Sequence, residues 1–303
     1  MQLKDNEISM ESRSEGRTES SSSSGLHSSN SDIPNQKGGE SVNGKDLGKM
    51  TSSDSKAWIP EDEVGYLART DNLKGLEDDS PRGKIVWRNV IIFAYVHMAA
   101  LYAVVMIITG KIRWQTMVFA WILHLLGGLG ITAGAHRCYS HKAYKAKTPL
   151  KILLVFMQTL AFQNSMWEWV RDHRVHHKYS ETNADPHNAR RGFFFAHIGW
   201  LLCRKHDLVR VKGKNVDLSD IEADRVLMFQ KKYHLPLGLL IAFVLPTYLP
   251  HKLWGESVLG GFLVASVFRY AFTLNMTWLV NSAAHMWGNK PYDKTINPSE
   301  NRM

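Results

Sequence analysis

Residues 90–109 read VIIFAYVHMAALYAVVMIIT, a stretch of twenty residues without an Asp, Glu, Lys or Arg. A helix needs about 20 predominantly apolar residues to cross the hydrocarbon core of a bilayer, so this stretch predicts a membrane-spanning helix. Three further stretches are long and apolar enough to do the same: Met117–Ala135, Tyr233–Leu249 and Val258–Val280. The sequence therefore predicts an all-α integral membrane protein with four transmembrane helices.

Short connections join these four helices in pairs. Residues 110–116 separate the first two and residues 250–257 the last two, so each pair is predicted to form a helical hairpin. Both hairpin turns must then lie on one side of the membrane, with the N-terminus and the long segment 136–232 on the other. That segment carries basic residues close to the helix ends, which the positive-inside tendency places in the cytosol. These residues are Arg137, Lys142, Lys145, Lys147, Arg225, Lys231 and Lys232.

Composition divides the chain at about residue 75. Residues 1–75 are rich in Ser, Gly, Asn, Lys and Glu and are predicted to be a disordered tail, because they cannot bury enough apolar surface to offset the entropy of ordering. Residues 76–303 form the predicted membrane domain. The formal net charge is +9, and the basic residues stand beside apolar segments rather than in one stripe. This distribution indicates a membrane surface and anionic substrates rather than nucleic acid.

Two shorter apolar runs, Leu150–Phe162 and Phe193–Cys203, fall short of a membrane span and are flanked by charge. They are expected to form interfacial or buried helices on the cytosolic side. Gly130 and Gly134, a GxxxG pair in the second predicted span, are expected to let a neighbouring helix approach closely.

Five histidines fall into two tight groups, HRCYSH at residues 136–141 and HRVHH at residues 173–177. On a helix, His173, His176 and His177 occupy positions i, i+3 and i+4. Their imidazoles therefore project from one face and can converge on a metal.

The spacing of His136 and His141 leaves two arrangements open. Residues five apart diverge by about 140° on a regular helix that turns ~100° per residue. The two imidazoles either serve one metal each or share a site where the helix end unwinds. His285, which follows Asn281-Ser-Ala-Ala at the cytosolic end of the fourth span, is a sixth candidate ligand. The other histidines are interpreted as ordinary core or surface residues: His27, His97, His124, His187, His197, His206, His234 and His251.

The type of ligand narrows the choice of metal. Neutral imidazole suits iron, copper, zinc and nickel, and the sequence has no thiolate pattern of the structural-zinc kind. Six histidines exceed what one tetrahedral zinc uses. A pair of iron ions is therefore favoured, and the membrane setting indicates oxygen chemistry on a lipid chain.

Three strings carry a resemblance to a known family: GAHRCYSHKAYKA at 134–146, WEWVRDHRVHHKYSETNADPHNARRGFFFAHIGWLL at 167–202 and TWLVNSAAHMWGNKPYDK at 277–294. They resemble the membrane acyl-CoA desaturases of the stearoyl-CoA (delta-9) type, in an insect-like form, from about Trp58 onward. The resemblance implies four transmembrane helices topped by a cytosolic cap in the endoplasmic reticulum membrane. It also implies two iron ions, electrons from cytochrome b5 and its NADH-dependent reductase, and conversion of a saturated fatty acyl-CoA to a cis-monounsaturated one with O2.

The same resemblance assigns residues to the site. The implied metal ligands are His136, His141, His173, His176, His177 and His285, with Asn281 reaching metal through water. The implied contacts to the CoA head group are Asn89, Asn164, Arg171, Asp172, Arg204 and Lys205, and Trp169 is implied to line a bent acyl tunnel.

One feature of the family pattern has no counterpart in this sequence. The family carries a third group, H-x-x-H-H, after the NSAAH string, and here no His follows His285. The polypeptide is therefore expected to hold metal poorly and to have little desaturase activity unless that segment is supplied elsewhere.

Other functions are weighed against desaturation. One alternative is a catalytically impaired, truncated paralogue that binds lipid or is a regulatory partner of an intact desaturase. A homo-oligomer, or a hetero-oligomer with another desaturase, is a further expected partner arrangement. Histidine-rich hydroxylases and alkane monooxygenases share the metal chemistry but insert oxygen. A transporter is disfavoured, because its ionisable residues would face a pathway inside the spans, whereas these groups lie outside the predicted ones.

Overall fold

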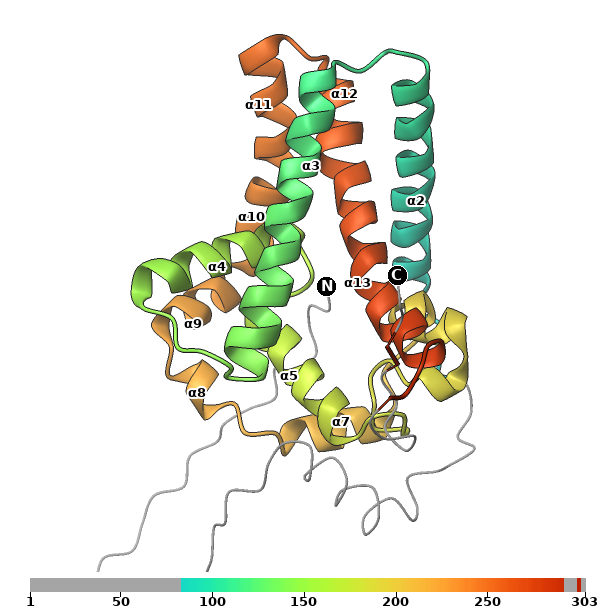
Figure 1. Ribbon diagram of the computed structural model, residues 1–303, viewed down its shortest axis with the longest axis vertical. Coiled ribbons are helices and arrows are strands. Elements are labelled where there is room, and N and C mark those ends of the chain that lie inside the picture. Colours follow the sequence, from blue (N-terminus) through green and yellow to red (C-terminus); the bar gives the residue numbers. More distant parts are fainter. Residues whose placement is uncertain (1–82, 292–298, 301–303) are drawn as a thin grey trace, which may run out of the picture. The chain divides into compact units, whose positions relative to one another are not determined.

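The computed structural model describes residues 83–291 together with 299 and 300. Within these residues every regular element is a helix, and the only extended pairings are isolated bridges (Figure 1). The all-α prediction is thereby confirmed. The disordered tail predicted for residues 1–75 lies outside the described residues.

Four helical segments are long and apolar enough to cross a membrane: Trp87–Ile108, Trp114–Ser140, His234–Trp254 and Val258–Met286. The first is α2, and the others change helix type along their length. The second joins α3 (Trp114–Leu129) to the π-helix η1 (Gly130–Ser140). The third comprises α10 (His234–Leu239), η4 (Leu240–Val244) and α11 (Leu245–Trp254). The fourth comprises α12 (Val258–Gly260), η5 (Gly261–Phe268) and α13 (Arg269–Met286). The four predicted spans are confirmed.

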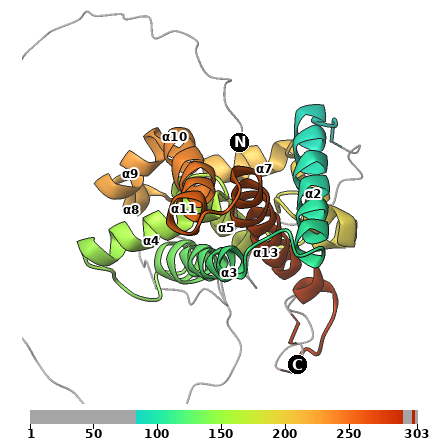
Figure 2. The ribbon, with the colours of Figure 1, turned by 90° about the horizontal axis from the view of Figure 1, so that it is seen from above.

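The fourth helical segment is the central one. It contacts each of the other three (Figure 2), and 67% of its apolar window is buried against 17% for α2. The outward faces of the other segments remain apolar and exposed, as lipid-facing surfaces require.

Three of the segments end well beyond their predicted C-terminal residues. The second helix runs to Ser140 rather than Ala135, and the fourth to Met286 rather than Val280. Hydropathy marks only the apolar part of a helix, whereas backbone hydrogen bonding continues into the polar sequence beyond it. The third helix passes through Pro250, where a turn was predicted. A transmembrane helix tolerates the missing N–H of a proline because neighbouring groups satisfy the freed backbone.

Both hairpin turns lie at the same end of the helices, as predicted (Figure 1). Glu256 links them: its carboxylate accepts hydrogen bonds from the backbone N–H of Arg113 (3.0 Å) and the hydroxyl of Thr116 (2.8 Å). Burial raises the pKa of Glu256, but these hydrogen bonds outweigh burial and the pKa is lowered. The two hairpins are therefore joined by charge-assisted hydrogen bonds.

The opposite end carries the cap, formed by the segment between η1 and α10. Its helices are α4 (Thr148–Ala161), α5 (Met166–Lys178), η2 (Ala189–Arg191), η3 (Phe195–Gly199), α6 (Trp200–Leu202), α7 (Asp207–Lys214), α8 (Ser219–Glu222) and α9 (Arg225–Lys232). The runs Leu150–Phe162 and Phe193–Cys203 are helical, as predicted. α4 is amphipathic: Leu154 and Leu160 are buried, whereas Ile152 and Phe156 are exposed.

Gly130 and Gly134 are the positions where α4 packs against η1. A Cβ atom at Gly130 would lie 2.3 Å from the backbone nitrogen of Gln158, and one at Gly134 would lie 3.4 Å from the Cβ atom of Leu154. The predicted close approach of a neighbouring helix is confirmed, and that neighbour is the cap helix α4.

Gly130→Ala is therefore expected to lower the free energy of unfolding by about 1–3 kcal/mol, the usual cost of overpacking, because the obstacle is backbone rather than a flexible side chain. Thermal unfolding in detergent measures the effect. Gly128→Ala is the matched control, since a Cβ atom there meets nothing within 4 Å. Equal melting temperatures for the two variants would show that the contact does not limit stability.

Candidate metal centre

The second histidine group is presented by a helix with a well-defined start. Ser165 caps α5: its hydroxyl accepts the N–H of Glu168 (3.3 Å), and the Glu168 carboxylate accepts the N–H of Ser165 (3.1 Å). This capping box fixes the first turn of α5. His173, His176 and His177 therefore occupy the last two turns on one side of a regular helix.

The π-helix η1 settles the relation between His136 and His141. The N–H of His141 donates to the carbonyl of His136 at 3.0 Å, an i to i+5 bond. Such bonding brings residues five apart onto the same side of a helix. The two ring centroids are consequently 4.4 Å apart, and the imidazoles share a site. The backbone therefore favours a shared site over the alternative in which His136 and His141 each bind a separate metal.

Four imidazoles meet where η1 approaches α5: His136, His141, His173 and His177, hereafter the first group. Their candidate ligand atoms all lie within 4.8 Å of one another. His173 is central, because its Nε2 is 3.2 Å from Nε2 of His141 and 2.9 Å from Nε2 of His177. Trp169 stacks on His173 with ring centroids 4.8 Å apart and buttresses this ring.

Burial keeps imidazoles of this site neutral. Burial, together with the neighbouring histidines, lowers the pKa of His177 to about 3 and places that of His173 well below its ordinary value. A neutral imidazole keeps one nitrogen lone pair free for a metal.

A second group adjoins the first. It contains His176, Asp185 and His187, whose candidate ligand atoms also lie within 4.8 Å of one another. His285 reaches it from α13, with its ring centroid 5.1 Å from that of His176. Asn281 precedes His285 by one helical turn on α13 and so shares its face.

His187 and Asp185 were not found from the sequence. His187, interpreted there as an ordinary histidine, has its ring centroid 4.2 Å from that of His176, and its Nδ1 is buried without a hydrogen bond among the described residues. The string ADPHN follows α5 by a few residues and contains Asp, Pro and Asn, which favour turns. These turn-forming residues are the one feature of the sequence that could have indicated that the chain folds back toward His176.

The donor set fits iron. Imidazole nitrogens suit a divalent transition metal better than calcium or magnesium, which prefer oxygen ligands. The six implied histidine ligands come from different parts of the chain, yet the structure brings them into two adjoining groups. Residues of both groups would hold the metal.

Arg171, Asp172 and Lys205 meet beside the histidines. The guanidinium of Arg171 donates to one carboxylate oxygen of Asp172 at 2.8 and 3.0 Å, and the ammonium of Lys205 donates to the other at 2.5 Å. Burial raises the pKa of Asp172, but Lys205 and Arg171 outweigh it and the pKa is lowered. Asp172 thus holds two cations in fixed positions on the cap.

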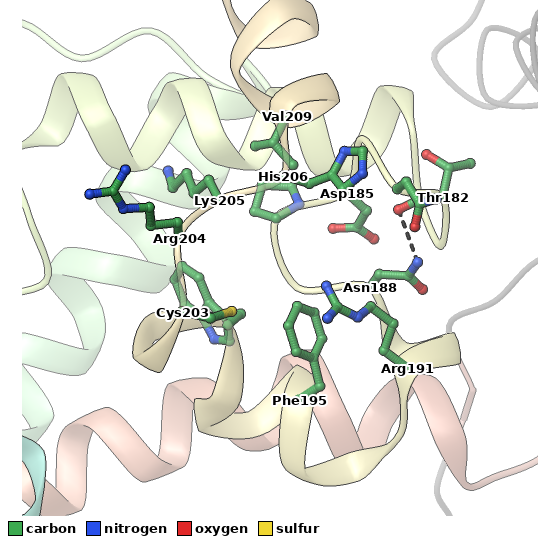
Figure 3. Close-up of a pocket in the computed structure, with 13 residues that line it drawn as sticks. Thr182, Asp185, Asn188, Arg191, Phe195, Cys203, Arg204, Lys205, His206 and Val209 are labelled. Carbon is green, nitrogen blue, oxygen red and sulfur yellow. Dashed lines mark hydrogen bonds between the residues drawn. The ribbon is translucent and has the colours of Figure 1, made fainter. Parts of the chain in front are cut away.

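Arg204 and Lys205 also line a small recess on the cap (Figure 3). The guanidinium of Arg204 is exposed and points away from Asp185 and Arg191, which face the recess from opposite sides (Figure 3). Asn89, on α2, donates to the carbonyl of Leu201 at 2.7 Å and so anchors the segment that leads to Arg204.

Asn164 precedes α5 by two residues. It lies in the turn between α4 and α5 with a left-handed φ of 64°, and its carbonyl accepts a hydrogen bond from Gln158 at 2.9 Å. The structure thus gathers Arg171, Asp172, Arg204 and Lys205 on one part of the cap and places Asn164 at the start of α5.

Comparison with known proteins agrees with this geometry. The fatty acid desaturase family matches residues 112–302. An acyl-CoA Delta-9 desaturase of Acheta domesticus is 58% identical over 258 residues, covering 83% of this chain and 72% of its own length. An acyl-CoA Delta12-desaturase of the same organism is 55% identical, covering 82% and 71%. A stearoyl-CoA desaturase of Bos taurus is 54% identical, covering 74% and 62%. This chain therefore spans between about three fifths and three quarters of these relatives, and it belongs to the fatty acid desaturase family.

Proposed function

We propose that this protein is an acyl-CoA desaturase that introduces a cis double bond into a saturated fatty acyl-CoA. Two hydrogens leave the acyl chain, and O2 is reduced to two molecules of water with two electrons and two protons. The electrons would come from cytochrome b5 and its NADH-dependent reductase. The observation that carries this proposal is the meeting of η1, α5 and α13 in two adjoining histidine groups at one end of four membrane helices.

Two iron ions held by these groups would supply the activation of O2 that an unactivated C–H bond requires, which no side chain provides alone. One iron ion would be held by His136, His141, His173 and His177. The other would be held by His176 and His285, with Asn281 acting through water. The chain's own residues would orient the substrate. Trp169, stacked on His173, would border the acyl chain next to the metal, so that one pair of methylenes is held at a fixed distance.

The cations of the cap would bind the CoA phosphates. Arg171 and Lys205 are already held by Asp172, so little side-chain entropy would be lost when a phosphate binds. Arg204 is exposed and would pair with a phosphate bidentately. The lysine and arginine residues near the helix ends would place this cap in the cytosol, at the endoplasmic reticulum membrane.

Product analysis tests the proposal. The full chain is supplied with a labelled saturated acyl-CoA, NADH, cytochrome b5 and its reductase in vesicles, and bound iron is measured on the same sample. A cis-monoene together with about two irons per chain supports a desaturase. An alcohol would replace the proposal with a hydroxylase, and bound acyl-CoA without any product would replace it with a lipid-binding role. The same analysis reports the position of the double bond, which matters because Delta-9 and Delta12 relatives are almost equally similar.

Arg204→Gln is expected to raise the KM for acyl-CoA about tenfold, equivalent to ~1.4 kcal/mol, while bound iron stays unchanged. The reason is the loss of one charge-assisted hydrogen bond to a phosphate. Arg210→Gln is the matched control, because Arg210 is exposed on the neighbouring α7 and pairs with Asp207. An equal KM for acyl-CoA in both variants would show that Arg204 does not contribute to acyl-CoA binding.

A further inference from the structure

The loop that follows α5 carries two carboxylates, Glu181 and Asp185, to which the family resemblance assigns no role. Asp185 belongs to the second group, and Glu181 lies next to His285. The loop is well anchored: the hydroxyl of Thr182 donates to the carbonyl of Tyr179 at 2.7 Å, and the side-chain amide of Asn188 donates to the carbonyl of Thr182 at 2.9 Å (Figure 3). Its carboxylates are therefore held in place by the loop.

Asp185 is 4% exposed and fully hydrogen-bonded. Its Oδ1 accepts the backbone N–H of His187 at 3.1 Å and lies 2.9 Å from Nδ1 of His176, while its Oδ2 accepts the backbone N–H of Glu181 at 2.8 Å. Two backbone donors pointing at the carboxylate fix it as an acceptor on both oxygens. Nδ1 of His176 must then be the donor in the third bond.

That bond determines the tautomer of His176. A neutral imidazole carries its proton on one nitrogen and a lone pair on the other. With the proton held on Nδ1 by Asp185, the lone pair of His176 stays on Nε2. Carboxylates that bind the far nitrogen of a metal-ligating histidine orient the ring and raise its basicity.

Glu181 lies near His285 on the other side of this group, beyond hydrogen-bond length. Its Oε1 lies 3.7 Å from Nδ1 of His285, and both side chains are largely buried. Glu181 adopts a left-handed backbone conformation with φ of 59°. A non-glycine residue accepts such a conformation at some energetic cost, and such positions cluster at functional sites. Here the conformation brings its N–H to Asp185 and its carboxylate toward His285.

We infer that Asp185 and Glu181 are positioning residues of the metal centre. Asp185 acts through His176, so that this imidazole presents Nε2 to metal, and Glu181 orients His285. The inference rests on the proposed metal-dependent function. It adds two carboxylates to a site that the resemblance describes with histidines and one asparagine.

Asp185→Asn tests the stronger of the two contacts. An amide offers one acceptor and one donor, so it cannot accept from His176 and from the N–H of Glu181 together. The affinity of the full chain for Co²⁺, titrated anaerobically against a chelator, is expected to fall about 10- to 100-fold, the usual loss for such a partner. Glu181→Gln is expected to cause a smaller loss, because 3.7 Å exceeds hydrogen-bond length.

A loop variant separates positioning from general loosening. Asn188→Ala removes a buried hydrogen bond of the same loop but does not touch His176. It is expected to lower the melting temperature of the metal-free chain at least as much as Asp185→Asn while leaving Co²⁺ affinity within about threefold of wild type. The d–d absorption of bound Co²⁺ provides a second readout, which is expected to change with Asp185→Asn and not with Asn188→Ala.

The outcomes distinguish this inference from the proposed function. If wild type binds Co²⁺ and Asp185→Asn binds it equally well, or if Asn188→Ala loses as much affinity, the inference fails and the metal centre stands. If wild type binds no Co²⁺, the proposed metal centre fails and the inference fails with it.

Discussion

Replacing His173 with alanine is expected to lower metal affinity by more than about 100-fold and to abolish desaturation. The Nε2 atom of His173 lies 3.2 Å from Nε2 of His141 and 2.9 Å from Nε2 of His177. Without His173, the remaining imidazoles would lose its close contacts with His141 and with His177. Loss of an outer partner of a metal site costs about 10- to 100-fold, so loss of a direct ligand should cost more.

The measurement is Co²⁺ or iron content after equilibration with a chelator, together with product formation. His251→Ala serves as the control, because His251 lies by the hairpin turn at the other end of the helices and contacts the carbonyl of Glu256. Its metal content should match wild type. Retention of metal by His173→Ala at wild-type affinity would move the centre away from the first group.

Replacing Arg269 with methionine is expected to destabilise the fold by about 3–5 kcal/mol, with a fall in melting temperature on the order of 10 °C. Arg269 is 1% exposed, at the start of α13 within the fourth helical segment. Its guanidinium donates to the carbonyls of Leu160 (2.8 Å), Ala242 (2.6 Å) and Ala265 (3.3 Å). These bonds hold the end of α4 and the two π-helices η4 and η5 together, so a methionine would leave carbonyls unpaired where lipid offers no donor.

Two further variants give the expected order of stability. Arg269→Lys should fall between wild type and Arg269→Met, because an ammonium lacks the planar fork that reaches three separate carbonyls. Arg210→Met, an exposed arginine with one surface ion pair, should stay within about 0.5 kcal/mol of wild type. A wild-type melting temperature for Arg269→Met in detergent would show that the carbonyls find other donors.

Much of the architecture is predictable from local sequence. Hydropathy locates the four helices because the bilayer sets one length for all of them. The i, i+3 and i+4 spacing of His173, His176 and His177 predicts a shared face because α5 is a regular helix. The helix ends are predicted less well. The apolar stretches end at Ala135 and Val280, whereas the helices continue to Ser140 and Met286.

The candidate site was only partly predictable. The i to i+5 bonding of η1 brings His136 and His141 together, and the spacing of the two residues alone does not predict it. Asp185 and His187 approach His176 because of the way the loop after α5 folds. Such a loop has no helical or strand periodicity from which its path could be predicted. The hydrogen bonds that give these residues their roles run between segments that the sequence alone cannot pair.

The amino-acid sequence by itself determined the membrane class, the number of spans and the presence of imidazoles suited to iron, because all three depend on residue type and short-range spacing. Only the tertiary structure decided that His136 and His141 share a site, that His187 and Asp185 face His176, and that Asp172 holds two cations. Each of these depends on distances between segments far apart in the chain, and such distances are set by helix packing.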